Sequence, residues 1–363
     1  MHRRGAVSGG TRRRTLRLAA LAALAWLALG ATLTGTAPAA GAQAVARSVA
    51  PVVARGRVDT LTFWSQALGT RKRALVWLPP SYSSQPARRY PSVYYLHGMW
   101  GSEIDWTTQG QLDVTLDSMV AAGLPEMIVV MPDGDDGWYA TWNRLLDISV
   151  CKASFKPRPG DETDATYCVP WPHYDDYIAH DLVSTIDARY RTVASRAQRA
   201  VAGLSMGGFG ALSMALQYPE VFRAAASHSG VVSPMYNGAH PFDGTPRYAA
   251  TDSALKESWG ERFWPIVGPV FGNDVAGWQA RDPFRRVQQL LATNPSLVPA
   301  IFLDCGTEDG LVDQNRALRA ELTRIGRAPQ YAEWPGKHDW PYWRVHARES
   351  LAWLAQQVTS RDR

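Results

Sequence analysis

Apolar residues recur along residues 57–358 with two different spacings. In two stretches, β-branched and aromatic residues alternate with polar ones, which predicts half-buried strands at 57–66 and 71–80 joined by a short turn. Later apolar runs are more continuous, the pattern of strands buried on both faces of a sheet, and they occupy 90–98, 126–134, 199–203, 222–230, 298–306 and 329–336. The segments between these runs predict helices at 111–123, 174–190, 206–219, 283–293, 314–326 and 343–358.

Strand and helix therefore alternate along most of the chain. Helices of about 12 residues between buried strands require parallel crossover connections. The pattern thus predicts an α/β fold, with a mostly parallel sheet and helices on both faces. One domain over 57–358 is expected, because the apolar content of 46% is ample for a core and no internal repeat follows residue 50. Ligands bind beyond the carboxyl ends of such strands, so the informative side chains should follow strands directly.

Two long stretches interrupt this alternation and are predicted to be insertions, near 138–173 and 232–280. Insertions of this length in a compact domain are usually functional loops or lids. The second stretch is rich in Gly, Pro and Trp, and its large aromatic residues favour a partly packed cap over the alternative of solvated surface.

The first 44 residues have the order of a secretory signal peptide, with arginines, then an apolar segment, then small residues and a predicted cleavage site at 42–44. The apolar segment, from about Leu18 to Leu29, is shorter than the ~20 residues of a membrane-spanning helix, which disfavours a retained anchor. We expect residues 1–44 to be removed on export and residues 45–56 to form a mobile leader. The mature protein should be secreted or stay at the cell envelope without a membrane span, and both general and twin-arginine export are open.

Removal of this segment changes the electrostatic picture. Its six arginines exceed the formal net charge of +5 and it contains no acidic residue, so the rest of the chain carries about −1. The basic character of the full chain belongs to the signal peptide, and a nucleic-acid partner is therefore not expected.

The chain contains three cysteines. Cys151 and Cys168 bracket a polar stretch that contains Pro and Gly, and an exported protein meets an oxidising environment, so we expect these two residues to form a disulfide. Cys305 follows an apolar run and is expected to be a buried, inert thiol.

A serine flanked by glycines stands between a predicted strand and a predicted helix, in the sequence GLSMG at 203–207. The Gly-x-Ser-x-Gly pattern by itself arises by chance in roughly one chain in ten of this size. Its position gives it more weight, because a strand-turn-helix junction is where a nucleophile elbow exposes a serine hydroxyl above a sheet. The glycines leave room for the close backbone approach of so tight a turn. We therefore predict that Ser205 is a catalytic nucleophile rather than a structural serine.

A serine nucleophile needs a histidine base and an acid that orients the base, and after an elbow of this kind they follow in the order acid, histidine. His338 lies after the last predicted strand and before the last helix, which is the position of the base. Glu308 and Asp309 follow the preceding strand, at whose end Asp304 lies. We favour Asp309 as the acid, with Glu308 second, because a residue farther into the loop can reach sideways toward the histidine.

The negative charge that develops on an attacked carbonyl oxygen requires two N–H donors. We predict the backbone N–H of Met206, directly after the nucleophile, and the backbone N–H of Met99, in the loop after the strand at 90–98. His97 and Gly98 shape the turn that carries Met99.

Five segments together carry a resemblance to a known family: VWLPPSY, YPSVYYLHGMWG, VAGLSMGGFGAL, LDCGTEDG and PGKHDWPYW. In this order and spacing, over about residues 57–358, the chain resembles an esterase family of α/β-hydrolases. That family includes feruloyl and other carbohydrate esterases, S-formylglutathione hydrolases of the esterase D type and the antigen 85 mycolyltransferases. The resemblance implies an α/β-hydrolase fold, a triad of Ser205, Asp309 and His338, and Met99 and Met206 as oxyanion-hole donors.

Branches of the family differ in the acid. HDWPYW is similar to the region around the catalytic histidine of the mycolyltransferases, whose acid is a glutamate, and this keeps Glu308 open. GTED is similar to the acid loop of feruloyl esterases and favours Asp309.

These observations predict an exported serine esterase that hydrolyses a small-molecule or carbohydrate ester through an acyl-enzyme on Ser205. The alternative is an acyltransferase of the mycolyltransferase type, in which a sugar hydroxyl replaces water, because the triad is the same for both. A catalytically silent extracellular binding protein is less favoured, since no member of the triad is missing.

Large aromatic residues in the predicted loops are candidates for lining the substrate site, although such residues more often belong to a core. They are Trp100, Trp138, Trp142, Trp171, Trp259, Trp264 and Trp340. No cofactor or metal is expected. The segment DGDDG at 133–137 hints at a calcium loop, but residue 144, where an EF-hand has glutamate, is Arg, so Asp133 and Asp135 are predicted to be turn residues.

Overall fold

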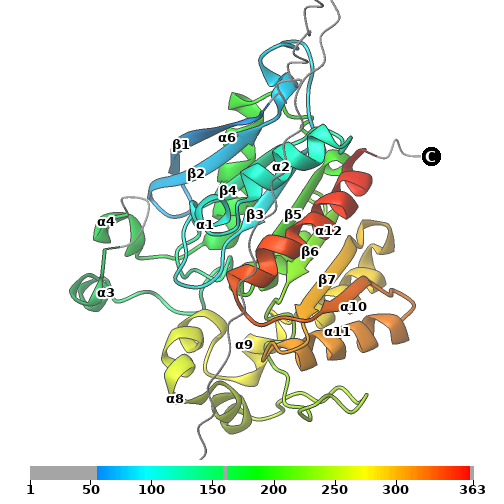
Figure 1. Ribbon diagram of the computed structural model, residues 1–363. Helices are drawn as coiled ribbons and strands as arrows, with labels where there is room; N and C mark the ends of the chain where they lie inside the picture. Colours follow the sequence, from blue (N-terminus) through cyan, green and yellow to red (C-terminus); the bar gives the residue numbers. More distant parts are fainter. Residues whose placement is uncertain (1–54, 158–161, 360–363) are drawn as a thin grey trace, which may run out of the picture. The chain divides into compact units, whose positions relative to one another are not determined.

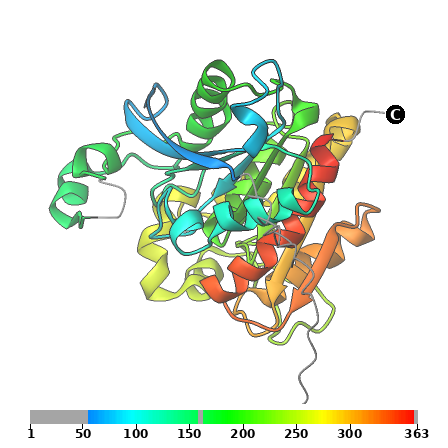
Figure 2. The same ribbon diagram turned by 45° about the horizontal axis from the view of Figure 1, so that its top comes forward.

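The computed structural model describes residues 55–157 and 162–359 (Figure 1). The predicted signal peptide lies outside the described residues, as does the predicted leader except for residues 55 and 56. The described chain has a sheet whose two faces are covered by helices (Figures 1 and 2). The α/β fold class predicted from the alternating pattern is therefore confirmed.

The described residues form one sheet of eight strands in the order β1-β2-β4-β3-β5-β6-β7-β8. β2 pairs antiparallel with β1 and with β4, whereas all other neighbours are parallel. The carboxyl ends of the parallel strands therefore lie at one edge of the sheet. The strands are β1 (Arg57–Ser65), β2 (Thr70–Leu78), β3 (Ser92–Leu96), β4 (Ile128–Pro132), β5 (Arg199–Leu204), β6 (Ala224–His228), β7 (Ala300–Gly306) and β8 (Gln330–Trp334).

Helices occupy the connections between the strands. The α-helices are α1 (Asp105–Thr108), α2 (Leu112–Ala121), α3 (Ile148–Ser154), α4 (Asp164–Tyr167), α5 (Tyr174–Asp176), α6 (Val183–Arg189), α7 (Met206–Gln217), α8 (Asp252–Phe271), α9 (Val275–Gln279), α10 (Pro283–Thr293), α11 (Val312–Arg324) and α12 (Trp340–Thr359). A π-helical segment, η2 (Tyr177–Leu182), joins α5 to α6, and 3-10 turns occur at η1 (Pro80–Tyr82), η3 (Arg196–Gln198) and η4 (Pro295–Leu297).

Each face of the sheet has its own apolar core, because successive strand residues point to opposite faces. The face covered by α2 and α12 buries residues such as Val93, Tyr95 and Leu351 (Figure 1). The opposite face, covered by helices that include α6, α7 and α10, buries Tyr94 and Phe209 among others. Every residue of β3, β4 and β5 is buried, which explains why these strands read as continuous apolar runs.

Two helices differ most from the sequence pattern, one in where it begins and one in its geometry. α12 begins at Trp340 rather than at 343, because Pro341 in the first turn lacks only an N–H that would have no helical partner there. The helix predicted over 174–190 is interrupted by η2, a local change of hydrogen bonding that apolar periodicity does not reveal.

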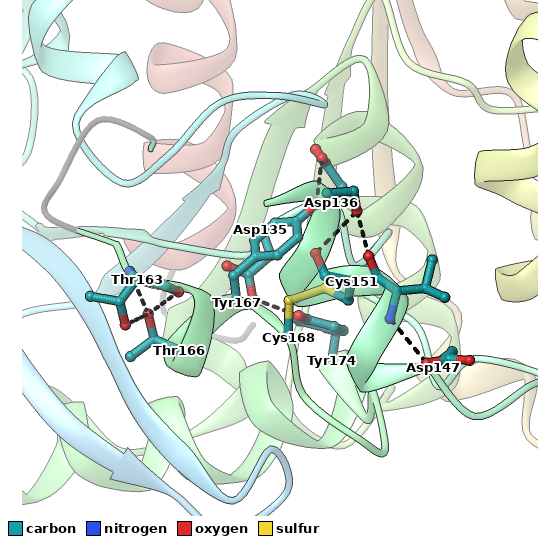
Figure 3. Close-up of a disulfide and its surroundings, with 11 residues drawn as sticks. Asp135, Asp136, Asp147, Cys151, Thr163, Thr166, Tyr167, Cys168 and Tyr174 are labelled. Carbon is teal, nitrogen blue, oxygen red and sulfur yellow. Dashed lines mark hydrogen bonds between the residues drawn. A yellow bond between two sulfur atoms is a disulfide. The ribbon is translucent and has the colours of Figure 1, made fainter. Parts of the chain in front are cut away.

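The two predicted insertions contain helices and loops. Residues 138–173 include α3 and α4. The predicted disulfide joins Cys151 in α3 to Cys168 directly after α4, with an S–S distance of 2.04 Å (Figure 3). Residues 232–280 include α9 and α8, which is kinked at Gly260 (φ 65°) and buries Leu255 and Phe271. The second insertion is thus packed against the core. Within residues 55–157 and 162–359, no helix has both the length and the apolar content to cross a membrane.

Candidate active site

Ser205 lies on a sharp turn between β5 and α7 and has φ 54° and ψ −117°, a conformation that residues other than glycine seldom adopt. The turn is held by the Ser205 N–H, which donates to the His228 carbonyl at 3.0 Å. A Cβ at Gly203 would overlap the backbone of Gly207, and one at Gly207 would overlap the backbone of Leu96. The flanking glycines are therefore required by packing, as the motif predicted.

His338 brings the serine and an acid together. Its Nε2 lies 2.9 Å from Ser205 Oγ, and its Nδ1 lies 2.9 Å from Asp309 Oδ2. An ionised carboxylate can only accept hydrogen bonds, so the Nδ1 of His338 carries a proton and donates a hydrogen bond to Asp309. The Nε2 atom is then free to accept the serine proton. The three residues follow the carboxyl ends of β5, β7 and β8, the edge at which the strand pattern placed them.

The environment of Asp309 keeps its carboxylate ionised. Burial by itself would raise the pKa of Asp309, but the hydrogen bond and charge of His338, with the Leu311 N–H at 2.8 Å, hold the pKa below its usual 3.8. The two other acids considered from the sequence lie elsewhere. Glu308 is exposed, and Asp304 is buried with an oxygen 2.6 Å from Nδ1 of His228.

The turn after β3 is built around His97. The Gly134 N–H donates to His97 Nε2 at 2.8 Å, so His97 carries its proton on Nδ1, which donates to the Gly98 carbonyl at 2.7 Å. That carbonyl belongs to the same peptide group as the Met99 N–H. Met99 and Met206, the two predicted oxyanion donors, both line the cavity into which Ser205 opens.

The cavity has a volume of about 610 Å³. Its walls are largely apolar, and the carboxylates and histidine among its described lining residues are Asp105, Asp309 and His338, with no Lys or Arg. Its aromatic walls are Trp100, Trp138, Tyr236, Trp259, Phe263, Trp340 and Trp343. A cavity of this size and character suits a neutral organic molecule.

Four of the tryptophans that the sequence suggested, Trp100, Trp138, Trp259 and Trp340, line this cavity. The other three do not line this cavity. Trp142 lines a separate cavity of about 260 Å³ beside the disulfide, Trp171 is exposed, and Trp264 stacks on Trp278 at 5.9 Å.

Three aromatic walls of the cavity, Tyr236, Phe263 and Trp343, were not predicted from the sequence. Trp343 contacts the His338 ring edge to face at 4.9 Å, and Phe263 stacks on Trp100 at 6.3 Å. Trp343 lies in the PYW segment beside the histidine, which was a usable signal. Phe263 lies in the second insertion, where nothing in the sequence distinguishes it from its aromatic neighbours.

A buried lysine next to the site was also missed. Lys72 Nζ lies 2.7 Å from Asp133, 2.6 Å from Asp135 and 3.0 Å from Glu162. Burial would lower the pKa of Lys72, but these carboxylates raise it well above 10.5. Asp135 does lie in a turn, as predicted, with Asp133 directly after β4. No motif in the sequence indicates that both are buried around a lysine from β2.

The remaining cysteine matches its prediction. Cys305 is a free, buried thiol in β7, and burial raises its pKa far above the ordinary range. A thiol held protonated in this way is unreactive.

A family model described as "Putative esterase" matches residues 65–354. The chain belongs to this esterase family. Esterase Rv1288 of Mycobacterium tuberculosis (strain H37Rv) is 30% identical over 76% of this chain and 54% of its own length, so this chain spans about half of that relative. The Acetyl esterase of Caldicellulosiruptor saccharolyticus is 23% identical over 82% of this chain and 97% of its own length.

Solved structures of esterases share the fold. A ferulic acid esterase aligns with a TM-score of 0.59 at 24% identity over 84% of this chain and 99% of that chain. FphF, a serine hydrolase of Staphylococcus aureus, aligns with a TM-score of 0.61 at 19% identity over 83% of this chain and 99% of that chain. The fold of this family member is therefore the α/β-hydrolase fold that its sequence resemblance implied.

Proposed function

We propose that the chain is an exported serine esterase, whose domain over residues 57–358 hydrolyses small, neutral carboxylic esters. The observation that carries the proposal is the chain of hydrogen bonds from Asp309 through His338 to Ser205, with the serine hydroxyl open to an apolar cavity. Family membership and relatives named as esterases support the same activity.

The geometry supports a two-step reaction. Ser205 Oγ attacks the ester carbonyl carbon while its proton passes to His338 Nε2. The oxyanion that forms accepts hydrogen bonds from the backbone N–H groups of Met99 and Met206. The tetrahedral adduct expels the alcohol, which takes the proton from His338, and an acyl ester remains on Ser205. Water then attacks the acyl carbon and gives a proton to His338, which passes it to Ser205 Oγ as the carboxylic acid leaves. Asp309 stabilises the imidazolium in both steps.

The walls of the cavity favour neutral substrates. Among its described lining residues no Lys or Arg offers a partner to an anionic group. Of its two carboxylates, Asp309 is paired with His338 and Asp105 accepts the Ser102 N–H. The aromatic walls suit an acyl chain, an aryl group or a sugar face.

Acyl transfer is the second candidate. The Ag85C mycolyltransferase of Mycobacterium leprae is 25% identical over 69% of this chain and 70% of its own length. The same acyl-enzyme would pass its acyl group to a sugar hydroxyl if that alcohol reached the acyl carbon before water.

Export is supported by two independent features. Residues 1–44 have the order of a signal peptide, and the Cys151–Cys168 disulfide requires an oxidising compartment to persist.

The proposal is tested with the mature protein and p-nitrophenyl acetate, butyrate and octanoate and methyl ferulate, each with and without trehalose or glucose. We expect hydrolysis that Ser205→Ala abolishes and that sugars leave unchanged. A rise on addition of sugar, with an acyl-sugar product, would instead identify the transferase. Equal rates for the wild type and Ser205→Ala would refute the serine mechanism.

A further inference from the structure

The turn at residues 97–101, here called the oxyanion turn, is fixed at both peptide groups that meet at the Met99 Cα. His97 Nδ1–H donates to the Gly98 carbonyl, which fixes the peptide that carries the Met99 N–H. The Trp100 N–H, on the next peptide, donates to Asp136 Oδ1 at 2.6 Å. Trp100 has a φ of 66°, in a region that bulky residues seldom adopt, so this turn needs support from its surroundings.

Asp136 is in turn held by the first insertion. Its second oxygen, Oδ2, accepts a hydrogen bond from the Tyr167 hydroxyl at 2.9 Å. Tyr167 is the last residue of α4 and directly precedes Cys168, whose disulfide partner Cys151 lies in α3. Figure 3 shows Asp136 and Tyr167 beside this disulfide. A continuous path of bonds therefore runs from the disulfide to the oxyanion turn.

The neighbouring residue contributes to the same arrangement. Asp135 accepts the Tyr174 hydroxyl through one oxygen and pairs with Lys72 through the other. Lys72 also pairs with Glu162 from the insertion, so the loop that carries Asp136 is anchored to β2 and to the insertion independently of Tyr167. Asp136 extends this anchored loop to the oxyanion turn itself, because it accepts the Trp100 N–H.

We propose that Asp136 is a positioning residue for the oxyanion hole, and that the Cys151–Cys168 disulfide maintains its position through Tyr167. The inference rests on the proposed esterase function. Without the Asp136 acceptor, the Met99–Trp100 peptide can rotate, and the bond from His97 alone is left to hold the strained turn. The Met99 N–H is then less firmly directed toward the position where the oxyanion forms. Asp136 does not touch the reacting atoms, so its loss should impair the transition state more than substrate binding.

The test compares Asp136→Ala with Asp136→Asn, which keeps an acceptor oxygen, and with Asp147→Ala. Asp147 is a matched control, because it caps α3 in the same insertion by accepting the Val150 N–H and has no bond to the oxyanion turn. Removing an oxyanion donor outright costs about 100- to 1,000-fold in kcat. We expect Asp136→Ala to lose about 10- to 100-fold in kcat with little change in KM. Asp136→Asn should recover most of this loss, and Asp147→Ala should stay close to the wild type.

A trifluoromethyl ketone provides a second readout. Ser205 adds to its carbonyl and forms a tetrahedral oxyanion, so its affinity reports the oxyanion hole directly. In Asp136→Ala this affinity should fall by the same factor as kcat/KM. A purely structural role would lower the melting temperature without this matched loss.

The proposal that the disulfide maintains the position of Asp136 is tested with Tyr167→Phe and with the Cys151→Ser/Cys168→Ser double variant. Both should lower kcat and ketone affinity less than Asp136→Ala does, and combining either with Asp136→Ala should add no further loss. Tyr167→Phe leaves the backbone intact and carries the test if the alanine variant fails to fold.

The outcomes separate the inference from the function on which it rests. If Ser205→Ala abolishes hydrolysis but Asp136→Ala matches Asp147→Ala in kcat and ketone affinity, the positioning role is refuted and the esterase function stands. If Ser205→Ala retains wild-type hydrolysis, the proposed function itself fails.

Discussion

Glu308 and Asp309 are adjacent carboxylic acids in one loop, yet their positions differ completely. The Glu308 N–H donates to the Gly336 carbonyl at 2.9 Å, and its side chain is exposed. The Asp309 N–H donates to the Gly306 carbonyl at 3.1 Å, and its buried carboxylate reaches His338. The backbone hydrogen bonds of the loop, rather than the chemistry of the side chains, decide which acid contacts the histidine.

Asp309→Asn should therefore abolish most activity, while Glu308→Gln should have little effect. An amide at 309 no longer stabilises the imidazolium and can hold the wrong tautomer of His338, and the comparable change in a serine protease costs about 10⁴-fold in kcat. We expect a loss of about 10³- to 10⁴-fold, measured as kcat on p-nitrophenyl butyrate. A larger loss in Glu308→Gln than in Asp309→Asn would overturn the assignment.

Glu103 makes folding dependent on pH. Its side chain is buried and lies 3.1 Å from Arg73, but burial and the charge of Asp133 raise its pKa to about 7. A folded-state pKa above the ordinary 4.5 means that protonated Glu103 favours the folded protein. This contribution is complete below about pH 4.5 and is lost as the pH rises through about 7.

Glu103→Gln should remove the loss of folding stability that the wild type shows as the pH rises through about 7. At pH 5 the variant and the wild type should have similar free energies of unfolding in urea, because Glu103 is then largely protonated. At pH 8 the variant should be more stable by about 2 to 3 kcal/mol. A variant that is less stable at pH 8 would show that the ion pair with Arg73 outweighs burial.

The junction of β5 and α7 is the structural element on which the site depends. Gly207, in the first turn of α7, packs against the backbone of Leu96 and His97 at the end of β3. This close approach sets the start of α7 against the oxyanion turn, and Met99, Ser205 and Met206 line one cavity. A glycine is required because any Cβ would push the helix away from the strand.

Gly207→Ala should separate these elements. We expect a loss of about 2 kcal/mol or more in the free energy of unfolding, as for an overpacked core, together with a lower kcat. Gly310→Ala is the control, because a Cβ there meets no atom within 4 Å, and its stability should match the wild type. Urea unfolding measures the free energy of unfolding of both variants. Equal stability of the two variants would contradict the packing argument.

At the scale of the whole molecule, the cavity exists only because the sheet order gathers distant segments. The turn after β3, the elbow after β5, the second insertion and the loops after β7 and β8 all contribute to its walls. Figure 1 shows α8 of that insertion as a separate element beyond the sheet. Its Phe263 forms part of the wall through its stack on Trp100.

Phe263→Ala should widen the cavity and change the substrate preference. We expect the ratio of kcat/KM for p-nitrophenyl octanoate over acetate to rise by about 10-fold, since a longer acyl chain can fill the space left by the ring. Trp64→Ala, which removes an exposed aromatic residue of β1, should leave the ratio unchanged. An unchanged ratio in Phe263→Ala would show that the acyl chain lies elsewhere.

Local sequence patterns were enough to predict the alternation of strands and helices, the turn at Ser205, the disulfide pair, and the positions of His338 and the acid loop after strands. These features depend on local properties, because apolar spacing follows from which face of an element is buried, and glycine and proline act on their own backbone. The fold class and the elbow could therefore be predicted from short stretches.

Packing between distant segments, by contrast, selects which of two adjacent acids reaches His338 and which tryptophans line the cavity, and it encloses Lys72 with three carboxylates. Lys72 and Glu162 are 90 residues apart, and the hydrogen bond between Ser205 and His338 spans 133 residues. The spacing of apolar residues does not predict such contacts, because they arise when the strand order brings separate loops together. A side chain's neighbours are fixed by packing between elements, whereas its element is fixed by the residues on either side of it.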